Sequence, residues 1–291
     1  MIDAIGSGGF PSLSVLPLLP PMNSIRWFIL AFVAALATPG LARAQYATGQ
    51  GQVKAFIVQG DVRLKDGTGN ETALTRYETF GEGNTIVTGA NGSTLLIFSN
   101  GAALQVEANT TLTLVRFDQE PFDPAQGAFL SLERDPSLSN TTLKLQQGAI
   151  KLEVKQLDVE AGSKFTVNTI VGSTRIQSAP SISTFVVSPN SNNEQVITIQ
   201  VADGTMSIRV TFRDPRIAFA DVGLVQISSG GRVVFTVTTN ASGEIPSLQA
   251  LGQNYPKADA QKSIAVLYND INTARVREGL PAVTPPEAVA N

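Results

Sequence analysis

Residues 84–115, NTIVTGANGSTLLIFSNGAALQVEANTTLTLV, constrain the fold of this chain more than any other stretch. They contain two Asn-Gly steps, at 91–92 and 100–101, each between short apolar runs. Asn-Gly in that setting is the strongest short-range hairpin signal, because a type I′ turn needs positive φ at both central residues. From 104 to 114 apolar residues recur mostly at every second position, which is the period of a half-buried strand. The stretch therefore predicts three short antiparallel strands joined by two tight turns.

The same rhythm of short apolar runs and turn residues continues from about Val53 to Thr239. It predicts further hairpin-like turns at Gln59-Gly60, Gln147-Gly148, Gly172, Asp203-Gly204 and Gly230-Gly231. Turns at intervals of roughly ten residues indicate a sandwich, a jelly roll or a rolled sheet rather than alternating β-α units. The turns share no fixed period, so no solenoid is predicted.

Two segments depart from this rhythm. Residues 118–140 carry three prolines and scattered charge, which predicts a surface excursion enclosing a short strand at 128–132. Residues 258–278 predict the single helix, which either caps the sandwich or binds a partner. Its apolar face is formed by Ile264, Leu267, Tyr268 and Ile271. The expected fold class is all-β, an antiparallel sandwich or jelly-roll-like domain with one C-terminal α-helix.

Composition excludes several kinds of chemistry. The 291-residue chain has 43% hydrophobic residues and a net charge of −3, which fits a packed body without a basic stripe for nucleic acid. It has no cysteine and no histidine. Disulfides, thiolate catalysis, histidine general bases and the usual zinc sites are therefore excluded. We expect no cofactor, no metal and no catalytic residues.

The segment Met22 to Gln45, MNSIRWFILAFVAALATPGLARAQ, has the pattern of a secretory signal peptide. It combines a positive residue, a short apolar core and a small-residue cleavage motif. The apolar core is too short to span a bilayer of ~30 Å comfortably, so an uncleaved anchor is the weaker alternative. The cleavage site is formed by Ala42, Ala44 and Gln45, with cutting expected before Gln45.

These features divide the chain into four expected segments. Residues 1–21 are interpreted as an extension upstream of the true start, and residues 22–44 as the signal peptide. The β domain covers 45–245, and a C-terminal helix with a proline-rich tail covers 246–291. The expected location is periplasmic or secreted, in a bacterium, and the membrane is engaged only during export.

The succession of motifs in the β domain resembles the periplasmic domain of the FecR family. The matching pieces are GDVRL at 60–64, TGANGSTLLIF at 88–98, SNGAALQVEANTTLTL at 99–114, LKLQQGAIKLEV at 143–154, SKFTVNT at 163–169 and VADGTMSI at 201–208. The chain departs from the family pattern at Asn100, where Asp is usual, at Ile170, where Pro is usual, and at Ser183, where Gly is common. The resemblance implies a β-rich envelope domain. In such systems the domain relays a receptor's state to a sigma factor, but a cleaved signal peptide would replace the segments that a direct anti-sigma role requires.

The charged side chains of the β domain have either a chemical role or an ordinary surface role. Acidic residues cluster in and beside the excursion, at Asp118, Glu120, Asp123, Glu133 and Asp135. Paired carboxylates could serve a glycosidase or bind calcium, but a solvated acidic loop is the simpler interpretation. Predicted strands carry or adjoin Lys144, Lys151, Lys155 and Lys164, which are expected to face solvent.

The sequence therefore predicts an exported, non-catalytic FecR-like domain. Its expected partner is a protein or polymer of the bacterial cell envelope, such as a polysaccharide or peptidoglycan, bound at a sheet edge or on a sheet face. The alternative is a structural or adhesive surface β-protein without a signalling role. An enzyme is a third alternative, and it would have to use carboxylates, lysine, tyrosine or hydroxyl groups.

Overall fold

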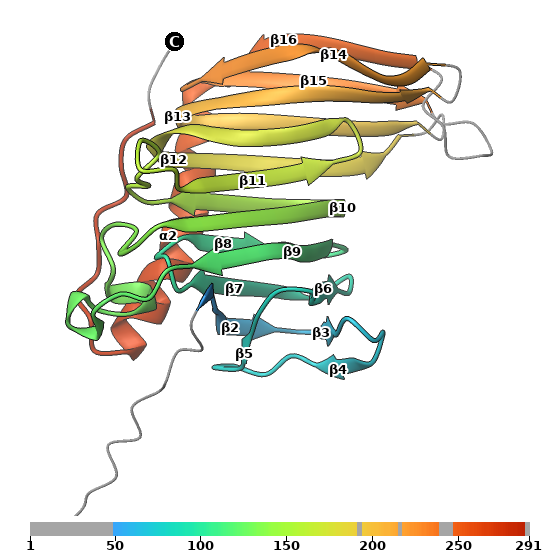
Figure 1. Ribbon diagram of the computed structural model, residues 1–291. Coiled ribbons are helices and arrows are strands. Elements are labelled where there is room, and N and C mark those ends of the chain that lie inside the picture. Colours follow the sequence, from blue (N-terminus) through green and yellow to red (C-terminus); the bar gives the residue numbers. More distant parts are fainter. Residues whose placement is uncertain (1–48, 191–193, 215–216, 239–246, 289–291) are drawn as a thin grey trace, which may run out of the picture. The chain divides into compact units, whose positions relative to one another are not determined.

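The computed structural model describes residues 49–190, 194–214, 217–238 and 247–288. Within these ranges sixteen strands form one sheet, and one α-helix follows them (Figure 1). The strands are β1 (Gly49–Gln50), β2 (Val53–Gln59), β3 (Val62–Lys65), β4 (Glu71–Ala73), β5 (Thr79–Phe80), β6 (Thr85–Thr88), β7 (Ser93–Phe98), β8 (Ala103–Val106), β9 (Thr111–Gln119), β10 (Ser139–Val154), β11 (Lys164–Thr169), β12 (Gly172–Pro189), β13 (Gln195–Asp214), β14 (Ile217–Ser228), β15 (Gly231–Thr238) and β16 (Ser247–Asn254). The helix is α2 (Lys257–Arg277). The predicted class, all-β with one C-terminal helix, is confirmed.

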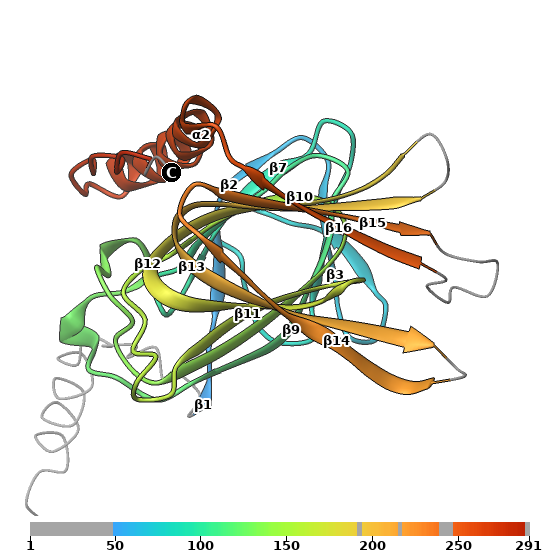
Figure 2. The same cartoon turned by 90° about the horizontal axis from the view of Figure 1, so that it is seen from above.

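The sheet folds back on itself into two layers, which Figure 2 shows end-on. One layer, here called the helix-side layer, runs β5-β2-β7-β8 and continues through parts of β10, β12 and β13 to β15 and β16. The other, here called the open layer, runs β4-β3-β6-β9 and continues through β10, β11, β12 and β13 to β14. Three long strands, β10, β12 and β13, therefore belong to both layers. Pairing is antiparallel throughout except between β10 and β11, which run parallel.

Most of the predicted hairpin turns are corners at which the chain passes from one layer to the other. The strands before and after Gln59-Gly60 pair with different neighbours, and the same holds at Asn91-Gly92. At Gln147-Gly148 and Asp203-Gly204 no turn interrupts the strand, which bends within β10 and β13 respectively. At Gly230 the chain leaves β14 and enters β15, which pairs with β13 and not with β14. These five hairpin predictions are wrong.

Two hairpins are confirmed, β7–β8 around Gly101 and β11–β12 before Gly172. In the first, Gly101 has φ +84° while Asn100 has no positive φ, so the turn is not the predicted type I′. The corner at Gln59-Gly60 packs directly against the corner at Asn91-Gly92. The amide of Gly89 donates to the Asp61 carbonyl at 2.8 Å, and a Cβ on Gly60 would lie 2.1 Å from the Asn91 carbonyl oxygen. A glycine is required where two backbones approach this closely.

The space between the layers holds the main hydrophobic core. Its side chains alternate along the strands, as in β9, where Leu112 and Leu114 are buried and their neighbours are partly exposed. Phe98 of the helix-side layer meets Phe117 and Phe165 of the open layer, with ring centroids 5.4 and 5.8 Å apart. Aromatic contacts of this edge-on kind stabilise the pair beyond their burial.

Helix α2 covers the outer face of the helix-side layer, so the prediction that it caps the sheet is confirmed (Figure 2). Its predicted apolar face is buried, with Ile264 and Leu267 at 0% exposure. That face packs on a second cluster of apolar residues from β2, β7 and β8, namely Phe56, Ile57, Leu95, Ile97 and Ala103. Strand β7 is therefore buried on both faces. No helix in the described ranges is long and apolar enough to cross a membrane.

Two boundaries differ from the prediction. The excursion between β9 and β10 contains two 3₁₀ turns, η1 (Pro124–Gln126) and η2 (Phe129–Ser131), in place of the predicted strand at 128–132. Strand β16 extends the sheet beyond residue 245, where the β domain was expected to end. The predicted extension, signal peptide and cleavage residues Ala42, Ala44 and Gln45 lie outside the described residues.

Candidate binding face

The acidic residues singled out in the sequence do not assemble into one site. Asp118 lies on β9 and is paired with Arg116. Glu120 and Asp123 are exposed, as is Glu133 farther along the excursion. No group of three or more acidic side chains that could hold a metal ion occurs in the described part of the chain.

Asp135 is the one member of this set with a perturbed environment. Burial raises its pKa to about 6, although the Ser139 hydroxyl donates to Oδ2 at 2.7 Å and opposes the shift. Ser139 in turn accepts from the Asn100 side-chain amide at 3.3 Å. Asn100, Ser139 and Thr141 are buried, so a small hydrogen-bonded network closes this end of the core. Ser163 and the backbone of Ser137 also oppose this shift in pKa, whereas the charge of Asp158 adds to it.

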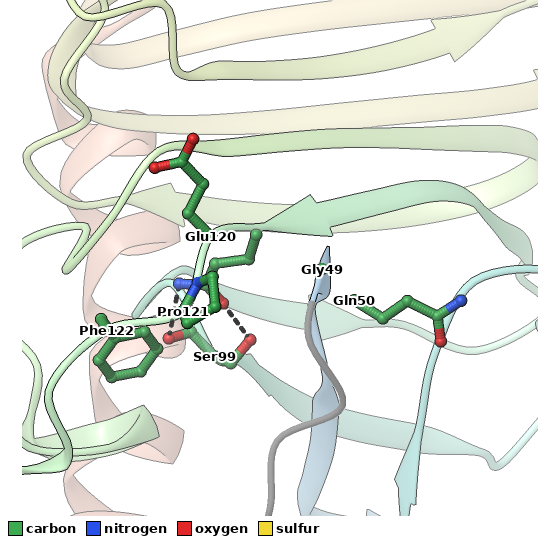
Figure 3. Close-up of a pocket in the computed structure, with 7 residues that line it drawn as sticks. Gly49, Gln50, Ser99, Glu120, Pro121 and Phe122 are labelled. Carbon is green, nitrogen blue, oxygen red and sulfur yellow. Dashed lines mark hydrogen bonds between the residues drawn. The ribbon is translucent and has the colours of Figure 1, made fainter.

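A shallow pocket adjoins this network at the start of β1. Figure 3 shows its wall, which is formed by Gly49, Gln50, Ser99, Gln119, Glu120, Pro121 and Phe122. The Ser99 hydroxyl donates to Gln119 Oε1, and the Gln119 amide donates back to the Ser99 carbonyl at 3.3 Å. The pocket has a volume of about 50 Å³. A larger pocket of about 370 Å³ shares Gly49, Gln119, Glu120 and Pro121 with it.

The outer face of the helix-side layer is already occupied. Tyr268 of α2 donates to Glu153 Oε1 at 2.6 Å, and both side chains are buried. Gln105 donates to Asp270 at 2.8 Å, and burial raises the pKa of Asp270. Burial also raises the pKa of Tyr268, which therefore remains a protonated donor at neutral pH. These contacts hold α2 on the part of the sheet that it covers.

Lys151 and Lys155 belong to that covered region. Lys151 is paired with Glu107, and the Lys155 ammonium donates to the Leu132 carbonyl. Burial lowers the pKa of Lys155. The prediction that these two lysines face solvent is wrong, whereas Lys144 and Lys164 are exposed as predicted.

No α-helix of the described residues covers the outer face of the open layer (Figure 2). Its side chains are mostly hydroxyls, amides and cations. Cross-strand register arranges them in rows, because directly opposed residues share a face. One row contains Thr113, Lys144, Asn168, Ser173 and Arg209 from β9, β10, β11, β12 and β13. The next contains Arg116, Thr142, Thr166, Arg175 and Ser207 from the same strands.

This surface, here called the open face, is strongly asymmetric in charge. Its basic residues on β9 to β13 are Arg116, Lys144, Lys164, Arg175 and Arg209, against one described carboxylate, Asp118. Lys144, Lys164 and Arg175 make no salt bridge with any residue in the described ranges. The whole chain is nevertheless acidic, at −3, so negative charge is concentrated elsewhere. A flat surface of one charge sign attracts ligands of the opposite sign.

Sequence reasoning identified two lysines of the open face without identifying the face. The signal is the alternation in LKLQQ and in SKFTVN, where a polar or basic residue follows each buried apolar one. What sequence alone does not give is the parallel pairing that sets Lys144 beside Asn168. Chain segments far apart in sequence must be placed in register before the rows appear.

In comparisons with known proteins, no protein-family model matches this chain, and no curated protein sequence matches it significantly.

Proposed function

We propose that this chain is an exported, non-catalytic domain of the FecR type that binds a partner in the bacterial cell envelope through the open face. The observation that carries the proposal is the uncompensated basic charge of Lys144, Lys164 and Arg175 on an uncovered sheet face. Export is supported by the signal-peptide pattern of residues 22–44. The FecR assignment rests on the succession of turn motifs from 60 to 208.

The partner that this surface fits best is a polymer with repeated anionic groups, such as a glycan that carries carboxylates or phosphates. Neighbouring strands are about 4.8 Å apart and residues along a strand about 3.3 Å, so Lys144 on β10 and Arg175 on β12, two strands across and two residues along, lie roughly 12 Å apart. Cations at such intervals can contact successive charges of an extended chain. The surrounding threonine, serine and asparagine side chains donate and accept hydrogen bonds with sugar hydroxyls.

A flat face of this kind favours multivalent over tight monovalent binding. Exposed charge pairs contribute about 0.2–1 kcal/mol each. Several such contacts along a polymer add up through effective concentration, without a deep pocket. The sequence has no histidine and no cysteine, so catalysis would have to rely on carboxylates, lysine, tyrosine or hydroxyl groups.

The experiment is co-sedimentation of the purified exported protein with isolated cell-wall sacculi, before and after their carboxyl groups are converted to amides. Retention of the protein on native sacculi and its loss on the amidated material is the expected result. Equal retention on both materials would contradict an electrostatic open face. No retention on either, with capture of a specific envelope protein by an intact open face, would replace the polymer with a protein partner.

A further inference from the structure

The two ends of the folded sheet are built differently. At one end the outermost strands are β4, with three residues, and β5, with two. Glu71 of β4 pairs with Arg63, so charge also protects that edge. Short strands and edge charges are the usual means by which proteins prevent edge-to-edge association. This end is closed to further strands.

At the other end the edge strands are long. Strand β14 has twelve residues and pairs only with β13, and β16 has eight residues and pairs only with β15, within the part of the chain that the structure describes. The sequence of β16, SLQALGQN, contains no charged residue. Leu224 of β14 and Leu251 of β16 are about 60% exposed, at 60% and 58%. Long edge strands with exposed leucines are sites at which another strand can add.

The two layers also end at different strands here, which creates a step. In the open layer β14 pairs with β13 and is the last strand. In the helix-side layer β15 pairs with β13 and β16 pairs with β15, so this layer is one strand longer. Phe235 and Val237 of β15 are fully buried beneath the opposite layer, at 0% exposure. Ala250 and Gly252, which oppose Phe235 and Val233 and therefore share their inward face, are exposed. No described strand lies across from β16.

We infer that a second copy of this chain occupies this step. Strands β14 and β16 run in the same direction, because β13 reverses its course where it bends between the layers: β14 is antiparallel to the half of β13 after the bend, and β16 is parallel to the half before it. A two-fold axis parallel to these strands, midway between the layers, exchanges the layers of the two copies. It places β16 of each copy beside β14 of the other and sets the inward faces of the two β16 strands against each other. Both layers then continue across the interface without a gap.

The self-complementarity of the step selects a second copy over an unrelated strand. One added peptide would extend the open layer and leave the free edge of β16 unpaired. A second copy pairs both edges and covers both inward faces in one isologous contact. Because β16 carries no charge, this contact brings no like charges together. The protected edge at β4 and β5 prevents growth into a filament, so the assembly ends at two chains.

The test is multi-angle light scattering after gel filtration of the exported protein over a concentration series, on the wild type and on the double variant Ala250→Glu/Gly252→Glu. Both positions are exposed in the single chain, and a Cβ on Gly252 meets no atom within 4 Å, so the variant should fold normally. The matched control is Thr72→Glu on β4, at the opposite end. Circular-dichroism melting verifies that each variant is folded.

The expected result is a wild type with the mass of two chains, a control that is also dimeric, and a double variant whose dissociation constant rises at least tenfold. A wild type that remains monomeric at about 100 µM would overturn the inference. So would a folded double variant that dimerises as the wild type does, or a mass that keeps growing with concentration. Binding of sacculi through the open face is measured separately, so a monomeric wild type leaves the proposed function standing.

Discussion

Replacing Gly148 with alanine should destabilise the protein severely, because two separate penalties coincide there. Gly148 lies where β10 bends between the layers and has φ +93°, in the left-handed region. That conformation costs a residue with a Cβ about 1–2 kcal/mol. A Cβ would also lie 2.4 Å from the backbone Cα of Thr110 and 2.2 Å from its hydroxyl oxygen. Overpacking of this kind costs about 1–3 kcal/mol.

The sum, about 2–5 kcal/mol, is a large part of a total stability of about 5–15 kcal/mol. For a chain of this length each kcal/mol lowers Tm by about 2–4 °C, so we expect a fall of roughly 5–15 °C in thermal unfolding. Two further glycines serve as matched controls. Gly83 has φ +86° but open space around it, so Gly83→Ala should cost only the conformational part, about 1–2 kcal/mol. Gly252 has neither penalty, and Gly252→Ala should change stability by less than about 0.5 kcal/mol.

These three glycine substitutions distinguish a corner at Gly148, where β10 bends between the layers, from a hairpin turn at the same residue. A glycine in the exposed turn of a hairpin would carry the conformational cost without the contact with Thr110. If Gly148→Ala proves as mild as Gly83→Ala, the stacking of Thr110 on the bend is wrong. The assignment of β10 to both layers would then fail with it.

Two other predictions concern buried polar groups. Tyr268→Phe removes the hydrogen-bond donor to buried Glu153 and should lower the free energy of unfolding by about 1–3 kcal/mol, measured in urea. Adding Glu153→Gln to Tyr268→Phe should restore part of the loss. An unchanged urea midpoint for Tyr268→Phe would contradict the anchoring of α2 by this bond. Asp135 has a folded pKa of about 6 against an unfolded value of about 3.9, so the native state binds more protons between these values and stability falls as pH rises from about 4 to above 6. Asp135→Asn should abolish that fall and raise stability by about 1–2 kcal/mol at pH 7.5, after allowance for partial exposure, with no difference below about pH 4. A pH profile parallel to that of the wild type would show that this carboxyl is not the titrating group.

Local sequence determined the strands and the helix well. The alternation around Leu112 and Leu114 predicts a half-buried strand, and the apolar face of α2 is the face that packs on the sheet. Both patterns depend on side chains within a few residues of one another. The burial of each face then follows from the period of the element.

The same local signals could not distinguish a hairpin from a corner. Gly60 and Gly148 have the left-handed φ that a tight hairpin also uses, so the residue type fits either geometry. The difference lies in what each strand pairs with, and β2 pairs with β7, more than thirty residues away for most of its length. The open face cannot be predicted from local sequence for the same reason. Its rows join Lys144, Asn168 and Arg209 from three strands, and only the long-range register brings them together.

The central claim is that the open face binds an anionic envelope polymer, and charge reversal tests it most directly. The measurement compares the sacculus affinity of Lys144→Glu/Arg175→Glu with that of Lys257→Glu/Lys262→Glu, which changes the charge equally on α2 over the opposite layer. The account predicts that the open-face variant loses most of its binding while the α2 variant retains it, and that wild-type binding weakens steeply between about 0.05 and 0.5 M salt as the Debye length shortens. Equal losses from the two variants, or binding that is insensitive to salt, would contradict it.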